Sequence, residues 1–213
     1  MRSLSLAALL SFIALNGAFA QKYEISIIGG YPRLSDASLG SIPLSEDPAP
    51  DDTKLKGEYT YGARFTINSK GYVGHEFGYS QSRARIDTVF RGTDAEDNSF
   101  ERRYRDRIVI SEGSYNLLLY MMPRGEWWRP YITIGGQTFH FGEPSAADWS
   151  TGSWRNYGIN WGGGIKLKAG PALLRLDFRD YIQGKPYGLD FQDFNSGGLY
   201  HSMQGTLGVG FTF

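Results

Sequence analysis

Apolar and polar residues alternate along most of the chain after residue 21, with the two-residue period of β-strands rather than the period of helices. The last segment is the clearest, because one face carries His201, Met203, Gly205, Leu207, Val209, Phe211 and Phe213 and the other carries only Ser, Gln, Thr and Gly. The other alternating segments are 23–31, 58–67, 72–81, 114–121, 130–141, 157–168 and 172–182. In segment 130–141 both faces are mixed, so its facing stays open.

The connections between these segments are sorted by length. Short connections at 68–71, 123–126 and 169–171 alternate with long ones at 32–57, 83–107, 142–156 and 184–199. Outer-membrane barrels have this rhythm, with short turns in the periplasm and long loops outside. The sequence therefore predicts an all-β, eight-stranded, antiparallel up-and-down transmembrane β-barrel. In this arrangement Asp51 and Asn98 lie outside, and Ser69 and Gly170 lie in the periplasm.

The N-terminus has the features of a secretory signal peptide. Arg2 supplies a positive charge, residues 4–15 are apolar apart from two serines, and Ala18-Phe19-Ala20 has the A-x-A form of a cleavage site. This apolar stretch is too short to span a hydrocarbon core of about 30 Å. We therefore expect residues 1–20 to be a signal peptide, with Ala18 and Ala20 forming its cleavage site, and residues 21–213 to form one outer-membrane β-barrel domain.

The polar faces of the segments indicate which side is inside. They consist mostly of Gly, Ser, Thr and Asn, which suits the narrow interior of an eight-stranded barrel better than a hydrated exterior. Aromatic residues gather near segment ends, as in interfacial girdles. These residues are Tyr59, Tyr61, Tyr72, Trp127, Trp128, Tyr131, Tyr157, Tyr200, Phe211 and Phe213. We expect the apolar faces to contact the lipids of the outer membrane.

Composition and charge exclude several classes of protein. The mean hydropathy of −0.36 is too low for a helical membrane bundle. Lys plus Arg and Asp plus Glu both number 22, so no net charge attracts nucleic acid. The absence of cysteine excludes disulfides, thiolate metal sites and a cysteine nucleophile. The three histidines lie in different segments without ligand spacing, so we expect neither a metal site nor a cofactor.

Several features together resemble a known family. They are the Ala18-Phe19-Ala20 leader end, the eight alternating segments, the stretch Arg175-Leu-Asp-Phe-Arg-Asp-Tyr181 and the closing Gly208-Val-Gly-Phe-Thr-Phe213. The chain resembles the small eight-stranded outer-membrane β-barrels, relatives of the outer-membrane protein A barrel and of the opacity-type surface proteins. The resemblance implies the outer membrane of a Gram-negative-type bacterium and a non-enzymatic, envelope-structural or surface-interaction role. We expect a monomer without a cell-wall tether.

The C-terminal strand carries a feature that the same resemblance explains. A terminal Phe preceded by alternate hydrophobic residues, here Val209, Phe211 and Phe213, resembles the signal recognised by the outer-membrane assembly machinery. We therefore expect that machinery to be a partner of this chain during insertion.

Some barrels of this type modify lipid A, so an enzyme is the main alternative, and a narrow pore is another. His201 and Ser202 are adjacent, which places their side chains on opposite faces of a strand. Lipid A deacylases pair His and Ser two residues apart, where this chain has Met203. His75 and His140 lie near strands, with Glu76 and Glu143 close by. We expect no catalytic residue.

The segment Arg102–Arg107 is the one basic cluster in the sequence. Glu96, Asp97, Glu101 and Asp106 lie within or beside it, so it is not a nucleic-acid patch. It is expected to be a charged loop tip or strand extension. The alternative is contact with lipopolysaccharide phosphates, which arginine binds in a bidentate manner.

Counting alternate positions predicts a set of charged side chains on the inward faces of the strands. They are Glu24, Arg64, Glu76, Lys166, Arg175, Asp177 and Arg179. Charges in a confined lumen are costly to desolvate, so they should pair across the barrel. Arg175 and Arg179 flank Asp177 on one face, and Glu76 or Glu24 is placed to bridge to them. Such a network would block the lumen and stiffen the barrel.

Overall fold

A computed structural model of the chain describes residues 22–36, 39, 52–69, 71–93, 98–145, 152–187 and 198–213. Ala18, Ala20 and Asp51 therefore lie outside the described residues. No helix in the described part of the chain is long and apolar enough to cross a membrane. The eight strands are β1 (Tyr23–Leu34), β2 (Asp52–Asn68), β3 (Val73–Thr93), β4 (Ser99–Tyr120), β5 (Trp128–Phe141), β6 (Trp154–Ala169), β7 (Ala172–Gly184) and β8 (Leu199–Thr212).

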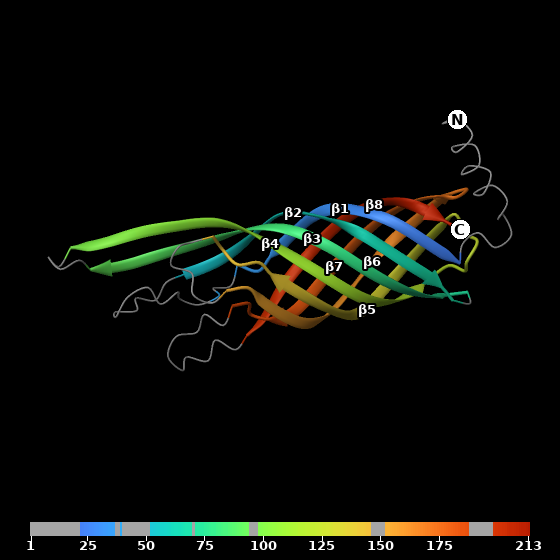
Figure 1. Cartoon of the computed structure of the whole chain (residues 1–213). Helices are drawn as coiled ribbons and strands as arrows, with labels where there is room; N and C mark the ends of the chain where they lie inside the picture. Colours follow the sequence, from blue (N-terminus) through green and yellow to red (C-terminus); the bar gives the residue numbers. More distant parts are fainter. Residues whose placement is uncertain are drawn as a thin grey trace, which may run out of the picture.

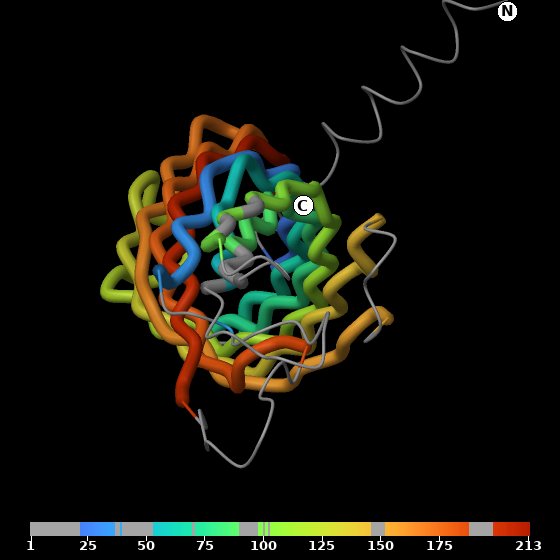
Figure 2. The backbone as a smooth tube through the Cα atoms, turned by 90° about the vertical axis from the view of Figure 1, so that its left-hand side faces the viewer, coloured from blue at the N-terminus to red at the C-terminus, as the bar shows by residue number. Residues whose placement is uncertain are grey.

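The strands form one closed barrel in sequence order (Figures 1 and 2). Every neighbouring pair is antiparallel, and β1 pairs with β8 from Glu24–Thr212 to Leu34–Ser202, which closes the ring. The predicted eight-stranded antiparallel fold is confirmed. The short connections need unusual backbone angles, and Gly71 and Gly170 provide them with φ values of 68° and 61°, which residues with a Cβ rarely adopt.

One hairpin extends far beyond the rest of the barrel. β3 and β4 stay paired as far as Thr93–Ser99, whereas the β4–β5 ladder ends at Ile110–Phe141. Figure 1 shows this hairpin projecting from the end of the barrel opposite the C-terminus. The expectation of a loop over 83–107 was therefore wrong for most of that range. Charged residues alternate with apolar ones there, which is a strand pattern with an unusually polar outer face.

The outer surface of the barrel wall is apolar. Large apolar side chains on the outward positions of all eight strands are exposed, including Ile27 at 65% and Ile134 at 58%. An exposed apolar surface of this extent fits lipid rather than water. Two aromatics expected in the girdles are instead buried inside, since Tyr131 is 2% exposed and Tyr200 is fully buried. The structure also gives the facing of β5, whose odd-numbered residues point inward.

Candidate functional site

The lumen holds all seven charged residues that the alternation places on inward faces. Each has an exposed fraction of 4% or less. They come from β1, β2, β3, β6 and β7, and cross-barrel contacts bring them together in the half of the barrel that contains the short turns. They form two adjoining clusters, one around Asp177 and Glu76 and one around Glu24.

Asp177 and Glu76 share three arginines. Arg175 Nε lies 2.8 Å from one oxygen of Asp177, and Arg175 Nη1 lies 2.9 Å from Glu76. Arg179 Nη2 lies 2.6 Å from Glu76 and 3.3 Å from Asp177. Arg64 reaches across from β2 to Asp177 at 2.9 Å. Each carboxylate therefore has a charge-assisted partner on more than one strand, which satisfies both of its oxygens.

Glu24 forms the second cluster with two lysines. Its carboxylate lies 2.5 Å from Lys166 Nζ and 3.1 Å from Lys168 Nζ. Asn68 donates its amide to the same carboxylate at 2.8 Å. Lys166 also donates to the Tyr120 hydroxyl at 2.9 Å. Glu24 therefore does not bridge to the arginines of β7, a role that falls to Glu76.

Several members of this site were missed by sequence reasoning. The facing of β5 stayed open, so Arg129 and Tyr131 were not placed inside. The Arg129 guanidinium stacks 3.5 Å from the centre of the Tyr120 ring. The Tyr131 hydroxyl donates to Asp177 and accepts a bond of 3.1 Å from Arg175. Lys168 lies on the polar face of its segment and was a recognisable candidate.

Glycine positions make room for the large buried side chains. A Cβ on Gly208 would lie 2.7 Å from Arg175 Cγ and 2.9 Å from Ile28 Cγ2. A Cβ on Gly164 would lie 2.7 Å from the Tyr131 hydroxyl. Both glycines point inward beside the β7 cluster, so the backbone can approach the arginine and tyrosine closely. This explains part of the high glycine content of the chain.

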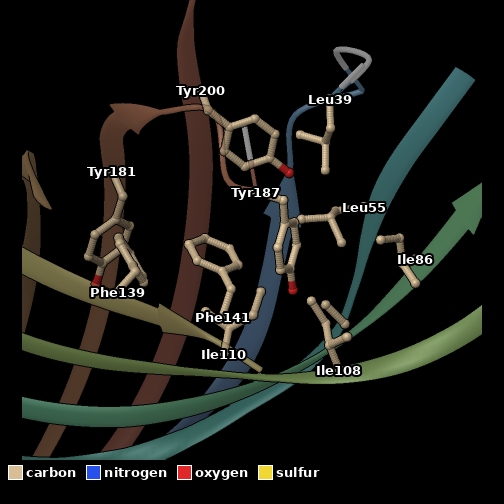
Figure 3. Close-up of a cluster of buried hydrophobic side chains, with 11 residues drawn as sticks. Leu39, Leu55, Ile86, Ile108, Ile110, Phe139, Phe141, Tyr181, Tyr187 and Tyr200 are labelled. Carbon is tan, nitrogen blue, oxygen red and sulfur yellow. The ribbon is translucent and has the colours of Figure 1, made fainter. Parts of the chain in front are cut away.

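The opposite half of the lumen holds a cluster of apolar side chains (Figure 3). One buried carboxylate, Glu112, lies beside this cluster and accepts a hydrogen bond of 2.9 Å from Ser80. Phe139 packs edge-on against Tyr181, and Phe141 packs edge-on against Tyr187. Leu55, Ala84, Ile86, Ile108, Ile110, Leu39 and Tyr200 complete the cluster. Burial raises the pKa of the Tyr187 hydroxyl, which stays protonated and donates to the Gly142 carbonyl at 2.6 Å.

The histidines do not assemble a buried site. His201 is exposed on the outward face of β8, with its Nδ1 3.0 Å from Asp180, whereas Ser202 points inward and is buried. His75 lies outward and its Nδ1 is 2.8 Å from the Tyr115 hydroxyl. His140 is also exposed, on β5. Within the described ranges, no three His, Cys, Asp or Glu side chains are grouped to hold a metal ion.

The residues of the expected assembly signal line one outer face of the last strand. Val209 and Phe211 are exposed on β8. Phe213 exchanges two backbone hydrogen bonds of 2.9 Å with Tyr23, and the two rings lie 5.9 Å apart. Phe213 therefore lies at the seam where the first and last strands close the barrel.

Comparison with solved structures decides the fold type. The outer membrane protein OprG from Pseudomonas aeruginosa is similar with a TM-score of 0.60 and 14% identity, over 91% of this chain and 97% of that one. Neisserial surface protein A is similar with a TM-score of 0.57 and 10% identity, over 91% and 99%. The chain has the fold of the small eight-stranded outer-membrane β-barrels.

A third outer-membrane barrel has the same fold. It is the N-terminal β-barrel domain of Pseudomonas aeruginosa OprF, with a TM-score of 0.51 and 15% identity over 91% of this chain and 99% of that one. The sequence matches no protein-family model, and no curated protein is similar enough to count as a relative. At such low identities the similarity to these outer-membrane barrels shows the fold alone. The role of this protein has to be inferred from its own side chains.

Proposed function

We propose that this outer-membrane barrel is a non-enzymatic, monomeric component of the envelope with a structural or surface-interaction role, and that its lumen is closed. The observation that carries the proposal is the cross-barrel network of Arg64, Glu76, Arg175, Asp177 and Arg179. An apolar cluster lies beyond it in the other half of the lumen. Among the described residues these two chemically different layers lie in series along the lumen, which supports a lumen closed to ions. A closed, ion-paired interior suits a mechanical or display role better than transport.

The decisive experiment combines conductance with stability. Wild-type protein in planar bilayers should carry no steady current. Arg175→Ala should leave Glu76 and Asp177 with one partner fewer and destabilise the barrel by about 3 kcal/mol. The same variant should conduct ions measurably. The control is Leu176→Ala, since Leu176 is the next residue on β7 and points outward to lipid. An Arg175→Ala barrel that is as heat-stable and as silent as the wild type would contradict the proposal, as would a conducting wild type.

A lipid A-modifying enzyme is the second candidate because of one observation on the outer surface. Asp180 lies 3.0 Å from His201 Nδ1, and the Ser35 amide donates to the His201 carbonyl at 2.9 Å. Ser35 therefore lies opposite His201 in the antiparallel register, where side chains share a face. An acid, a histidine and a serine in that order is the arrangement of a serine hydrolase.

Mass spectrometry of lipid A separates the two candidates. Cells with the wild-type gene, cells without it and cells with Ser35→Ala or His201→Ala should all show the same number of acyl chains if the barrel is not an enzyme. A change in acyl number that depends on both Ser35 and His201 would establish the second candidate and remove the first.

A further inference from the structure

The part of β2, β3 and β4 that extends beyond the barrel has two different faces. Its inner face carries Leu55, Ala84, Ile86 and Ile108, which are buried in the apolar cluster. Among the described residues, its outer face carries more basic side chains than acidic ones. The basic residues are Lys54, Lys56, Arg83, Arg85, Arg103, Arg105 and Arg107, and the acidic residues are Glu58, Asp87 and Glu101. We call this outer face the basic face. Because the apolar side is packed, the basic face must point away from the barrel axis.

Two acids of the basic face, Asp87 and Glu58, each contact two bases. Asp87 lies 3.3 Å from Lys56 and 3.1 Å from Arg105. Glu58 lies 2.9 Å from Arg85 and 3.4 Å from Arg107. The hydrogen bond from Arg85 lowers the pKa of the Glu58 carboxyl, so Glu58 stays ionised. Two carboxylates among four cations leave an excess of positive charge on this surface.

The charges also lie at two depths. The side chains of Asp87 and Glu58 are 21% exposed, whereas those of Arg105 and Arg107 are 64% and 71% exposed. The carboxylates therefore lie beneath, and the guanidinium groups extend above them into solvent. A guanidinium has five N–H donors, and a single bond to a carboxylate leaves others available for a second anion. Exposed ion pairs of this kind contribute little to stability.

A depression of about 230 Å³ lies within the basic face. Lys54, Lys56, Asp87, Arg103, Tyr104 and Arg105 are among the residues that line it. Sites for drug-sized molecules occupy roughly 300–1,000 Å³ and are mostly apolar. This depression is smaller and polar, so it fits a single compact anionic group such as a phosphate rather than a complete small molecule.

The height of the basic face above the membrane indicates where that anion comes from. Tyr59, Tyr61 and Tyr79 are exposed below it, and Gln81 joins Tyr61 and Tyr79 through hydrogen bonds of 2.8 and 3.0 Å. Such exposed tyrosines mark the membrane interface. Lys56 and Lys54 precede Tyr59 on β2 by three and five residues, which places them about 7–12 Å further from the membrane for a tilted strand. The headgroup layer of a bilayer leaflet is roughly 5–8 Å thick.

We propose that the basic face binds phosphate groups on the headgroups of lipopolysaccharide in the surrounding outer leaflet. Arg105 and Arg107 contribute bidentate donors, and Lys54 and Lys56 contribute point charges at the edge of the depression. In this arrangement the hairpin of β3 and β4 lies at the membrane surface and binds the glycolipid through its basic face. The proposal is independent of whether the lumen is closed, because no lumen residue takes part in it.

The test uses the full chain in phosphatidylcholine nanodiscs that contain a small fraction of lipopolysaccharide, either intact or with its phosphates removed. Native mass spectrometry counts the glycolipid molecules retained by the barrel. Wild-type protein should retain intact lipopolysaccharide at least about tenfold better than the dephosphorylated form. Arg105→Gln combined with Arg107→Gln should abolish that preference. Arg155→Gln, which removes an exposed cation on β6, should retain it.

A second pair of variants separates binding from folding. Glu58→Gln combined with Asp87→Asn removes the underlying carboxylates and should strengthen the retention of intact lipopolysaccharide. If the cations only serve as ion-pair partners, the same change should weaken the hairpin and leave retention unaltered, which would overturn the proposal. Equal retention of the two forms of lipopolysaccharide would also overturn it. Displacement by millimolar inorganic phosphate would assign the face to a soluble phosphate instead of a lipid headgroup.

Discussion

Arg175 is the residue on which most of the lumen network converges. It contacts Asp177 on its own strand, Glu76 on β3, Ser26 on β1 and the Tyr131 hydroxyl on β5. A fully buried arginine is tolerated only when its donors are paired, because the desolvation of an isolated charge is costly. Gly208 on β8 lies directly opposite Arg175 in the register and leaves room for its side chain. The position of this one arginine therefore depends on five strands.

Gly208→Val tests that dependence. The added Cβ would meet Arg175 and Ile28 at distances below 3.0 Å, so either the arginine or the strand must move. We expect a loss of stability of about 1–3 kcal/mol, measured by urea unfolding in lipid vesicles. Gly205→Ala is the matched control on the same strand, because a Cβ added there would have no other atom within 4 Å. Equal stabilities of the two variants would show that Gly208 does not make room for Arg175.

At the scale of the strands, alternation was sufficient to predict eight antiparallel elements and seven of the charged side chains that face inward, but not Arg129 or Lys168. It failed where the chemistry of the lumen changes. β5 has Arg129 at one end of its inward face and Phe141 at the other, so neither face has a uniform polarity. The extension of β3 and β4 was predicted to be a loop because its outer face is charged. That face lies in water, so the many charged residues hid the alternation of apolar positions that is typical of a strand.

The last strand gives a prediction at the same scale. Phe213→Ser should reduce the amount of folded barrel in the outer membrane while leaving export to the periplasm intact, because the exposed ring is part of the expected assembly signal. Heat-modifiable migration of the membrane fraction in gels measures folded barrel, and periplasmic extracts measure export. Leu199→Ser, at the opposite end of β8 and also exposed, should have no effect. Normal membrane levels of the Phe213→Ser variant would show that Phe213 is not needed as part of the assembly signal.

For the whole molecule, the apolar belt, the two-layered lumen and the hairpin define a direction across the membrane. The C-terminus and the short turns lie at the end that contains the charged half of the lumen, and the hairpin lies at the other end (Figure 1). In outer-membrane barrels the short turns face the periplasm. The charged network should therefore lie nearer the periplasm and the apolar cluster nearer the cell surface.

Cysteine labelling on intact cells tests this direction. The chain has no cysteine, so single substitutions give no background. Asn98→Cys, next to the hairpin tip, should react with a membrane-impermeant thiol reagent, and Ser69→Cys should react only after the outer membrane is opened. Ser69 is a better site than Gly170, because Gly170 has a positive φ that cysteine would strain. Labelling of Ser69→Cys on intact cells would reverse the proposed orientation.

β4 is paired with β3 over a much longer stretch than with β5, so one edge of β4 near the hairpin tip affects how two copies of this protein can contact each other. The β4–β5 ladder stops at Ile110, and Gly142 adds one backbone hydrogen bond to Val109, so the residues of β4 before Val109 pair with no other described strand on that side. A bare strand edge in water is a template for pairing with another chain, and proteins protect such edges with charged side chains. Arg103, Arg105 and Arg107 occupy every second position along this edge. Two identical edges brought together would place like charges against each other, so the hairpin resists stacking into fibrils on a crowded cell surface.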